Sequence, residues 1–124
     1  MNRLVIDSWA WIEFLKGNAK GAAVKNAIAG ADLATVSTNL YEVLYRTSED
    51  EGEPAAEKAR LFIESHSQII PVDGNLAYAA VRVRREEKLH ALDAFAYAAA
   101  RQWGAKLLTG DPHFRGKRDI QFIE

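Results

Sequence analysis

The sequence contains no cysteine, which excludes disulfide bonds, thiolate-bound zinc and thiol catalysis. It also lacks a long hydrophobic run, since no uninterrupted apolar stretch approaches the roughly 18 residues of a membrane span. The first residues, MNRLVIDSW, turn acidic after three apolar positions, unlike a secretory signal. An excess of one charge is missing too, because 16 Lys and Arg residues face 17 Asp and Glu residues. We therefore expect a soluble, cytoplasmic protein without a membrane anchor, in which any nucleic-acid site is local.

The composition is that of a globular protein, with 48% hydrophobic and 27% charged residues in a chain of 124. A domain of this length buries roughly two thirds of its extended surface on folding, which is enough for a core without covalent or metal crosslinks. No linker, internal repeat or low-complexity segment divides the chain. We expect one domain over residues 1–124.

Short apolar runs alternate with segments of helical periodicity. The runs rich in apolar and β-branched residues predict strands over 4–6, 33–36, 69–72 and 106–109, with a weaker edge strand over 120–123. Helices are expected over 8–15, 22–29, 40–47, 54–63, 73–87 and 92–103. Strands separated by helices indicate right-handed crossovers and parallel pairing. The predicted fold class is α/β, with a central, mainly parallel sheet of four to five short strands flanked by helices on both faces.

Four acidic residues are placed where such a sheet would gather them. Asp7 ends the first strand and Asp111 follows the fourth, while Glu42 is expected in the first turn of the helix after the second strand. Asp93 opens the last helix, directly before the fourth strand. Parallel sheets bind ligands at the carboxyl ends of their strands, so we expect these four carboxylates to lie together.

An all-carboxylate cluster suits Mg²⁺ or Mn²⁺, which prefer oxygen ligands, and it disfavours zinc. Such ions activate water and stabilise the leaving oxygen in phosphodiester hydrolysis, so the cluster predicts metal-assisted nuclease chemistry. Crowding is also expected to raise the pKa of at least one of the acids when no metal is bound.

Each acid has a structural alternative. Glu42 with Asn39 resembles a capping box, Asp93 favours the dipole of its helix, and Asp7 is placed to cap the first helix. Asp111 precedes proline in a common turn dipeptide. The functional interpretation depends on all four acids falling on the same edge of the sheet.

The segments that carry these acids resemble the PIN-domain family and, within it, the single-domain VapC-type ribonuclease toxins of toxin–antitoxin pairs. VIDSWAWIEFL is similar to the first strand and helix of the family, and NLYEVLYR to its Asn and Glu segment. LDAFAYAAAR and LLTGDPHF are similar to its third and fourth acidic motifs. The resemblance covers nearly the whole chain. It implies a PIN-like fold and cleavage of RNA at a Mg²⁺ site, with Mn²⁺ as an alternative, formed by Asp7, Glu42, Asp93 and Asp111.

The resemblance also implies neighbours and partners for the site. Ser8, Asn39 and Thr109 are its expected supporting residues, and the partners are the RNA substrate, a cognate antitoxin protein and a second copy of the chain in a homodimer. His113 stands where several relatives carry a further acid, so the number of metal ions stays open. This histidine is expected either to pack in its turn or to contact substrate phosphate.

Two other functions remain as alternatives. A Mg²⁺-binding phosphoacceptor domain of the receiver type also gathers acids at strand ends, although it has one helix per crossover and an acceptor Asp directly ending its third strand. A catalytically silent PIN scaffold is the other alternative. Two basic stretches, over 82–88 and 115–118, are candidates for contacts with an RNA backbone.

Overall fold

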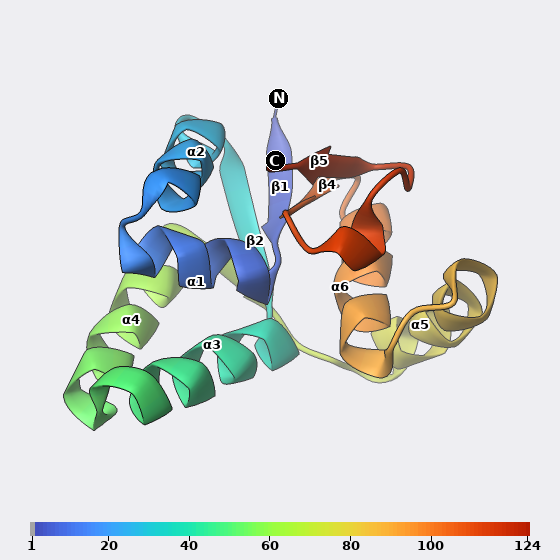
Figure 1. The fold of residues 1–124 in the computed structure, drawn as a ribbon. Coiled ribbons are helices and arrows are strands. Elements are labelled where there is room, and N and C mark those ends of the chain that lie inside the picture. Colours follow the sequence, from blue (N-terminus) through green and yellow to red (C-terminus); the bar gives the residue numbers. More distant parts are fainter. Residues whose placement is uncertain (1) are drawn as a thin grey trace.

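Five parallel strands form a single sheet in the computed structural model, which describes residues 2–124 (Figure 1). Their order is β3-β2-β1-β4-β5, and every neighbouring pair is parallel. The strands are β1 (Arg3–Ile6), β2 (Asp32–Val36), β3 (Gln68–Ile70), β4 (Lys106–Thr109) and β5 (Ile120–Phe122). The predicted α/β class is confirmed, and the weak C-terminal run is indeed an edge strand.

Pairs of helices connect the first four strands. The helices are α1 (Ser8–Lys16), α2 (Ala19–Ile28), α3 (Ser37–Glu51), α4 (Glu53–His66), α5 (Gly74–Glu87) and α6 (Ala91–Gln102), with a short 3₁₀ helix η1 (Pro112–Phe114) after β4. Receiver domains have one helix per crossover and the strand order 2-1-3-4-5. The paired helices and the order observed here therefore exclude the phosphoacceptor alternative.

The helices cover both faces of the sheet, as Figure 1 shows with the strands nearly edge-on. Alternation along β1 divides the core, because Leu4 and Ile6 point to one face and Val5 to the other. The first face packs against apolar side chains of α1 to α4, including the fully buried Trp11. The second packs against α5 and against α6, whose Ala96–Ala100 segment is buried throughout. Two hydrophobic layers thus hold the strands in place.

Local chemistry moves two predicted boundaries. Helix α2 begins three residues earlier than expected, because the side chain of Asn18 accepts a hydrogen bond from the backbone N–H of Gly21 and caps the helix. Strand β3 ends at Ile70 and not at Val72, since Pro71 has no N–H to continue the ladder. Asp73, the first residue of the helix expected over 73–87, is the N-cap of α5, since its side chain accepts from the N–H of Leu76 at 2.9 Å.

Over residues 2–124, none of the helices is both long enough and apolar enough to cross a membrane.

Candidate active site

The site lies at the carboxyl end of β1, the strand at which the connections of the sheet change direction. β1 lies between β2 and β4, so the connections from β1 to β2 and from β3 to β4 lead to opposite sides of it. Ligands of open parallel sheets bind outside the strand ends at such a point. Asp7 directly follows β1 and Asp111 follows β4 by two residues, which places both at this edge. In Figure 1, α3 and the start of α6 lie below the same edge.

Asp7 is the buried centre of the cluster, with only 3% of its surface exposed. Its Oδ2 accepts a hydrogen bond from the Thr109 hydroxyl at 2.7 Å, and its Oδ1 accepts from the Asn39 amide at 3.3 Å. The Thr109 oxygen in turn accepts from the backbone N–H of Asp111 at 3.0 Å. Asp7 occupies the N-cap position of α1 but makes no side-chain capping bond. Its carboxylate is therefore oriented toward β4 and α3, not toward its own helix.

Glu42 lies in the second turn of α3, one turn later than predicted, because this helix begins at Ser37 directly after β2. Its Oε1 accepts from the Ser8 hydroxyl at 2.5 Å and from the Asn39 amide at 3.4 Å. The Asn39 amide also donates to the Ser8 oxygen at 2.7 Å. The capping-box alternative is wrong, since Asn39 lies inside the helix and is buried. The Asn39 amide donates directly to the carboxylates of Asp7 and Glu42 and so connects them.

Asp93 and Asp111 border the other side of the site. Asp93 is the third residue of α6 and is half-buried. The Oδ1 of Asp111 accepts from the N–H of His113 at 2.9 Å and so caps η1, as its turn dipeptide suggested. Asp111 thus caps the 3₁₀ helix and also faces the site.

All four acids line one cleft. Its other lining residues come from α1 and α3, and the complete set is Asp7, Ser8, Trp9, Ile12, Glu13, Lys16, Glu42, Arg46, Asp93 and Asp111. The structure therefore brings together the four carboxylates and Ser8. Asn39 and Thr109 do not line the cleft but hold Asp7, Ser8 and Glu42 by hydrogen bonds.

Burial and charge raise the proton affinity of two of these acids. The pKa of Asp7 rises to about 7, first because the carboxylate is removed from water and then because Asp93, Asp111 and Glu42 are near; the Thr109 hydrogen bond opposes the rise. The pKa of Asp93 is also raised, first by burial and then by the charges of Asp111 and Glu42. His113 and His90 oppose this rise. A raised pKa was expected from crowding, but for both residues burial is the larger cause.

The donor set fits a divalent cation. Three aspartates and one glutamate converge from the ends of β1 and β4, from α3 and from α6. Hydroxyl and amide groups of Ser8, Asn39 and Thr109 stabilise the carboxylates of Asp7 and Glu42 among them. Hard ions such as Mg²⁺ and Mn²⁺ bind carboxylate oxygen, and a nearby cation favours the charged form of each acid. A bound cation therefore offsets the free-energy cost of burying Asp7 as an anion.

Two basic residues at the rim of the cleft were missed from the sequence. Lys16 lies at the end of α1 and Arg46 lies on α3, one turn after Glu42. Lys16 pairs with the partly buried Glu13 at 3.9 Å and Arg46 with the exposed Asp50 at 3.4 Å, but the side chains of Lys16 and Arg46 are themselves 50% and 58% exposed, so both cations are accessible. The spacing of four residues from Glu42 to Arg46 was a usable signal, because it puts both on one helix face.

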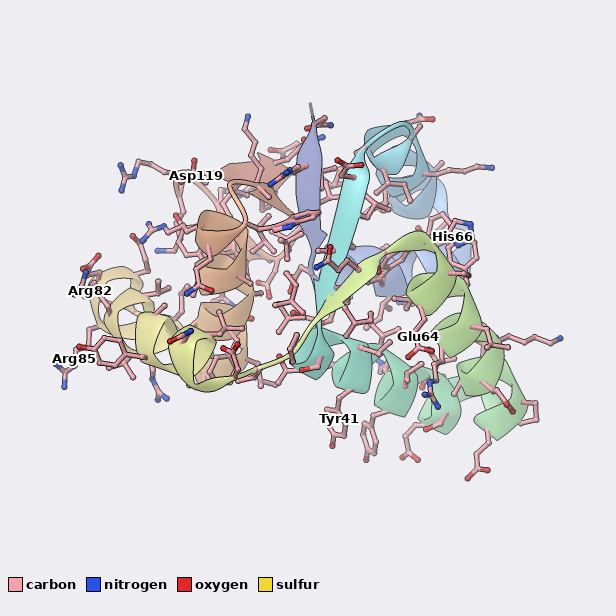
Figure 2. The ribbon with its side chains drawn as sticks, turned by 180° about the vertical axis from the view of Figure 1, so that it is seen from behind. Tyr41, Glu64, His66, Arg82, Arg85 and Asp119 are labelled. Atoms are coloured by element: carbon pink, nitrogen blue, oxygen red, sulfur yellow. The ribbon has the colours of Figure 1, made fainter. Side chains whose placement is uncertain are left out.

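The basic stretches noted in the sequence do not line the cleft. Arg82 and Arg85 extend outward from α5 (Figure 2). Arg115 pairs with Glu124 at 3.0 Å, and Lys117 pairs with Glu87 at 3.2 Å. Contacts between these stretches and a substrate held in the cleft are therefore less direct than contacts of Lys16 and Arg46.

One wall of the cleft depends on a glycine. A Cβ added at Gly110 would lie 2.3 Å from Cη2 of Trp9 and 2.7 Å from the carbonyl oxygen of Ile123. Trp9 is half-buried and lines the cleft, so its ring packs on the bare backbone between β4 and Asp111. The glycine is required here for close approach.

We expect Gly110→Ala to lower the free energy of unfolding by about 1 to 3 kcal/mol, because Trp9 must move to avoid the overpacked methyl group. Urea denaturation measures the change. Gly74→Ala is the matched control, since the space at Gly74 is open and its backbone is not left-handed, and it should leave stability nearly unchanged. Equal stability of Gly110→Ala and the wild type would contradict this packing.

The family model described as the PIN domain matches residues 4–119. A comparison with curated protein sequences gives no match.

Solved structures with the same fold come from several bacteria. A toxin–antitoxin complex from Klebsiella pneumoniae superposes with a TM-score of 0.83 at 22% identity, covering 98% of each chain. VapC20 of Mycobacterium tuberculosis, described as a toxin that cleaves the sarcin-ricin loop, gives 0.74 at 21% identity, covering 95% of this chain and 98% of that one. DNA-bound VapBC from Salmonella typhimurium gives 0.76 at 16% identity, covering 98% and 97%. At these identities the likeness is one of fold.

Proposed function

This chain belongs to the PIN-domain family, and on that premise we propose that it is a Mg²⁺- or Mn²⁺-dependent endoribonuclease, the toxin of a toxin–antitoxin pair. The observation that carries the proposal is the convergence of Asp7, Glu42, Asp93 and Asp111 on one cleft at the strand ends. RNA as the substrate is supported by the neighbour from Mycobacterium tuberculosis, which is described as cleaving the sarcin-ricin loop. The toxin role is supported by neighbours described as toxin–antitoxin complexes.

Each residue of the cleft has a task in this proposal. Asp7, Asp93 and Asp111 hold the cation, and Glu42 completes the negative site from α3. Thr109 fixes one oxygen of Asp7, while Ser8 and Asn39 fix one oxygen of Glu42, so these carboxylates need little rearrangement when a cation binds. A bound divalent cation supplies an activated water nucleophile and neutralises charge that develops on the scissile phosphate.

Lys16 and Arg46 position the RNA. Both lie on the rim of the cleft, where a phosphate group next to the scissile one would pass. Contacts of Lys and Arg with phosphate orient a nucleic acid without reading its sequence. They also counter the negative field of the four acids, which by itself repels the substrate.

Cleavage of RNA by the purified protein, with and without chelator, tests the proposed activity. We expect cleavage with Mg²⁺ or Mn²⁺, none with EDTA, restoration when Mn²⁺ is added back, and no cleavage of DNA of the same sequence. Absence of cleavage with either metal across transfer, ribosomal and messenger RNA would favour the silent-scaffold alternative.

The proposed antitoxin neutralises the site with a basic side chain, since an arginine satisfies clustered carboxylates in place of a metal. The surface beside the cleft offers an apolar groove for the rest of such a partner. It lies between α1, α3 and α4 and is lined by Phe14, Leu15, Thr47, Glu51, Ala55, Lys58, Ala59 and Phe62. The proposed location is the cytoplasm, where RNA and an antitoxin meet. The homodimer stays a prediction from the resemblance.

Expression of the wild-type chain alone is expected to arrest growth of its native host, because uncontrolled RNA cleavage stops protein synthesis. Co-expression of the antitoxin should restore growth. Colony counts after induction measure the effect, and Asp93→Asn expressed at the same level is the control. Unimpaired growth with active wild-type enzyme present would contradict the toxin role and leave the nuclease proposal standing.

A further inference from the structure

One histidine lies beside the carboxylates that has no task in the proposal above. His113 is the middle residue of η1, and its Nδ1 lies 3.0 Å from Oδ1 of Asp111. One ligand atom each from Asp93, Asp111 and His113 lie within 4.8 Å of one another. A nitrogen donor is thus grouped with two of the four acids.

We propose that His113 is a nitrogen ligand of the divalent cation, bound together with Asp93 and Asp111, and that it makes this site prefer Mn²⁺ over Mg²⁺. The inference rests on the proposed function, because it concerns the cation of that same site. It adds a ligand and a metal preference that four carboxylates alone do not supply.

The distances agree with a shared ion. Ligand atoms lie about 2.1 Å from ions of this size, so adjacent ligands of an octahedral site are about 3 Å apart and opposite ligands about 4.2 Å apart. The 3.0 Å between Nδ1 of His113 and Oδ1 of Asp111 is therefore the spacing of two adjacent positions. Bringing the three atoms from within 4.8 Å to octahedral spacing requires shifts of about half an ångström, which a 3₁₀ turn and side-chain rotation accommodate.

The surroundings of His113 leave its ring available. The side chain is 64% exposed, so it contributes little to the core. The ring of His90, which is also exposed, lies 6.0 Å from that of His113 in an edge-to-face arrangement. Cation binding would replace the contact between Nδ1 and Asp111 by two bonds to the same ion.

The chemistry of imidazole gives the direction of the preference. Carboxylate and water suit both Mg²⁺ and Mn²⁺, whereas imidazole is a good ligand for transition metals and a poor one for Mg²⁺. A simple ion pair between His113 and Asp111 would not discriminate between the two cations. The two interpretations therefore differ in what replacement of the histidine does.

Pulsed electron paramagnetic resonance of bound Mn²⁺ detects a directly coordinated nitrogen. We expect ¹⁴N coupling in the wild type and in His90→Gln, the matched control, and its loss in His113→Ala and His113→Asp. We also expect the dissociation constant of Mn²⁺ to rise roughly tenfold in His113→Ala. In His113→Asp, whose new carboxylate supplies an oxygen donor, the preference for Mn²⁺ over Mg²⁺ should fall by a similar factor.

The outcomes separate this inference from the proposed function. Mn²⁺ bound to the wild type without ¹⁴N coupling, or with coupling that persists in His113→Asp, would overturn the nitrogen ligand and leave the carboxylate site standing. Failure of the wild type to bind Mn²⁺ at all would overturn both.

Discussion

Asp93→Asn is expected to lower the rate of RNA cleavage by at least about a thousandfold while the protein stays folded. The substitution preserves the size of the side chain but removes a negative charge and a metal ligand, so cation positioning and charge stabilisation are lost together. Asp93 is half-buried near the start of α6, whose N-cap residue is His90, and among residues 2–124 its carboxylate takes part in no hydrogen bond or ion pair of the fold. The fold therefore does not depend on this carboxylate.

The measurement is cleavage of a labelled RNA at saturating Mn²⁺, with circular dichroism to verify the fold. Asp32→Asn is the matched control, because Asp32 is an exposed aspartate at the opposite end of β2, and full activity is expected from it. If Asp93→Asn keeps more than about a tenth of wild-type activity, the cleft is not the catalytic site.

Asp7→Asn is expected to stabilise the metal-free protein at pH 8, although it should also be inactive. The pKa of Asp7 is about 7 in the folded protein, against 3.8 for an ordinary aspartate. An acid with a raised folded pKa contributes stability that is fully present below about pH 4 and is lost as the pH rises through 7. The loss is on the order of 4 kcal/mol, since each tenfold change in proton affinity corresponds to about 1.4 kcal/mol.

Asparagine cannot ionise, so the variant escapes this loss. The new side chain still accepts the hydrogen bond of Thr109, but its NH₂ group faces the NH₂ group of Asn39 and loses that hydrogen bond. This loss reduces the gain in the free energy of unfolding by about 1 to 2 kcal/mol. Asp93, whose pKa is also raised, adds a dependence of the same sign to both proteins. We expect a net gain of about 2 kcal/mol at pH 8 and little or no gain at pH 5.

Thermal melts in EDTA at the two pH values measure this effect, which corresponds to a rise in Tm of roughly 6 °C or more at pH 8. Mg²⁺ at ten times its dissociation constant should stabilise the wild type by about 1.4 kcal/mol and Asp7→Asn much less. The burial cost assigned to Asp7 is contradicted if the variant melts no higher than the wild type at pH 8 in EDTA.

The sequence predicted those parts of the fold and site that depend on local pattern. Short apolar runs such as 4–6 and 106–109 are strands because their side chains fill both faces of a buried sheet. Asp7 and Asp111 were identifiable because they end such runs, and parallel pairing then fixes which edge they share.

The remaining features depend on tertiary contacts. Glu42 lies one turn further along α3 than predicted, because the helix starts directly at the end of β2. The roles of Asn39 and Thr109 require the assembled sheet, since each binds the Asp7 carboxylate, more than 30 residues away in the chain. The burial that raises the pKa of Asp7 is likewise produced by the packing of α1, α3 and β4 around it, and no local pattern encodes it.

The central claim is that Asp7, Asp93 and Asp111 hold one cation in the cleft, with Glu42 completing the negative site, and anomalous diffraction from crystals soaked in Mn²⁺ tests it most directly. The account predicts an anomalous peak in the cleft, within about 2.4 Å of carboxylate oxygens of Asp7, Asp93 and Asp111, and its loss in Asp93→Asn. No peak in the cleft at a Mn²⁺ concentration that supports RNA cleavage would contradict it.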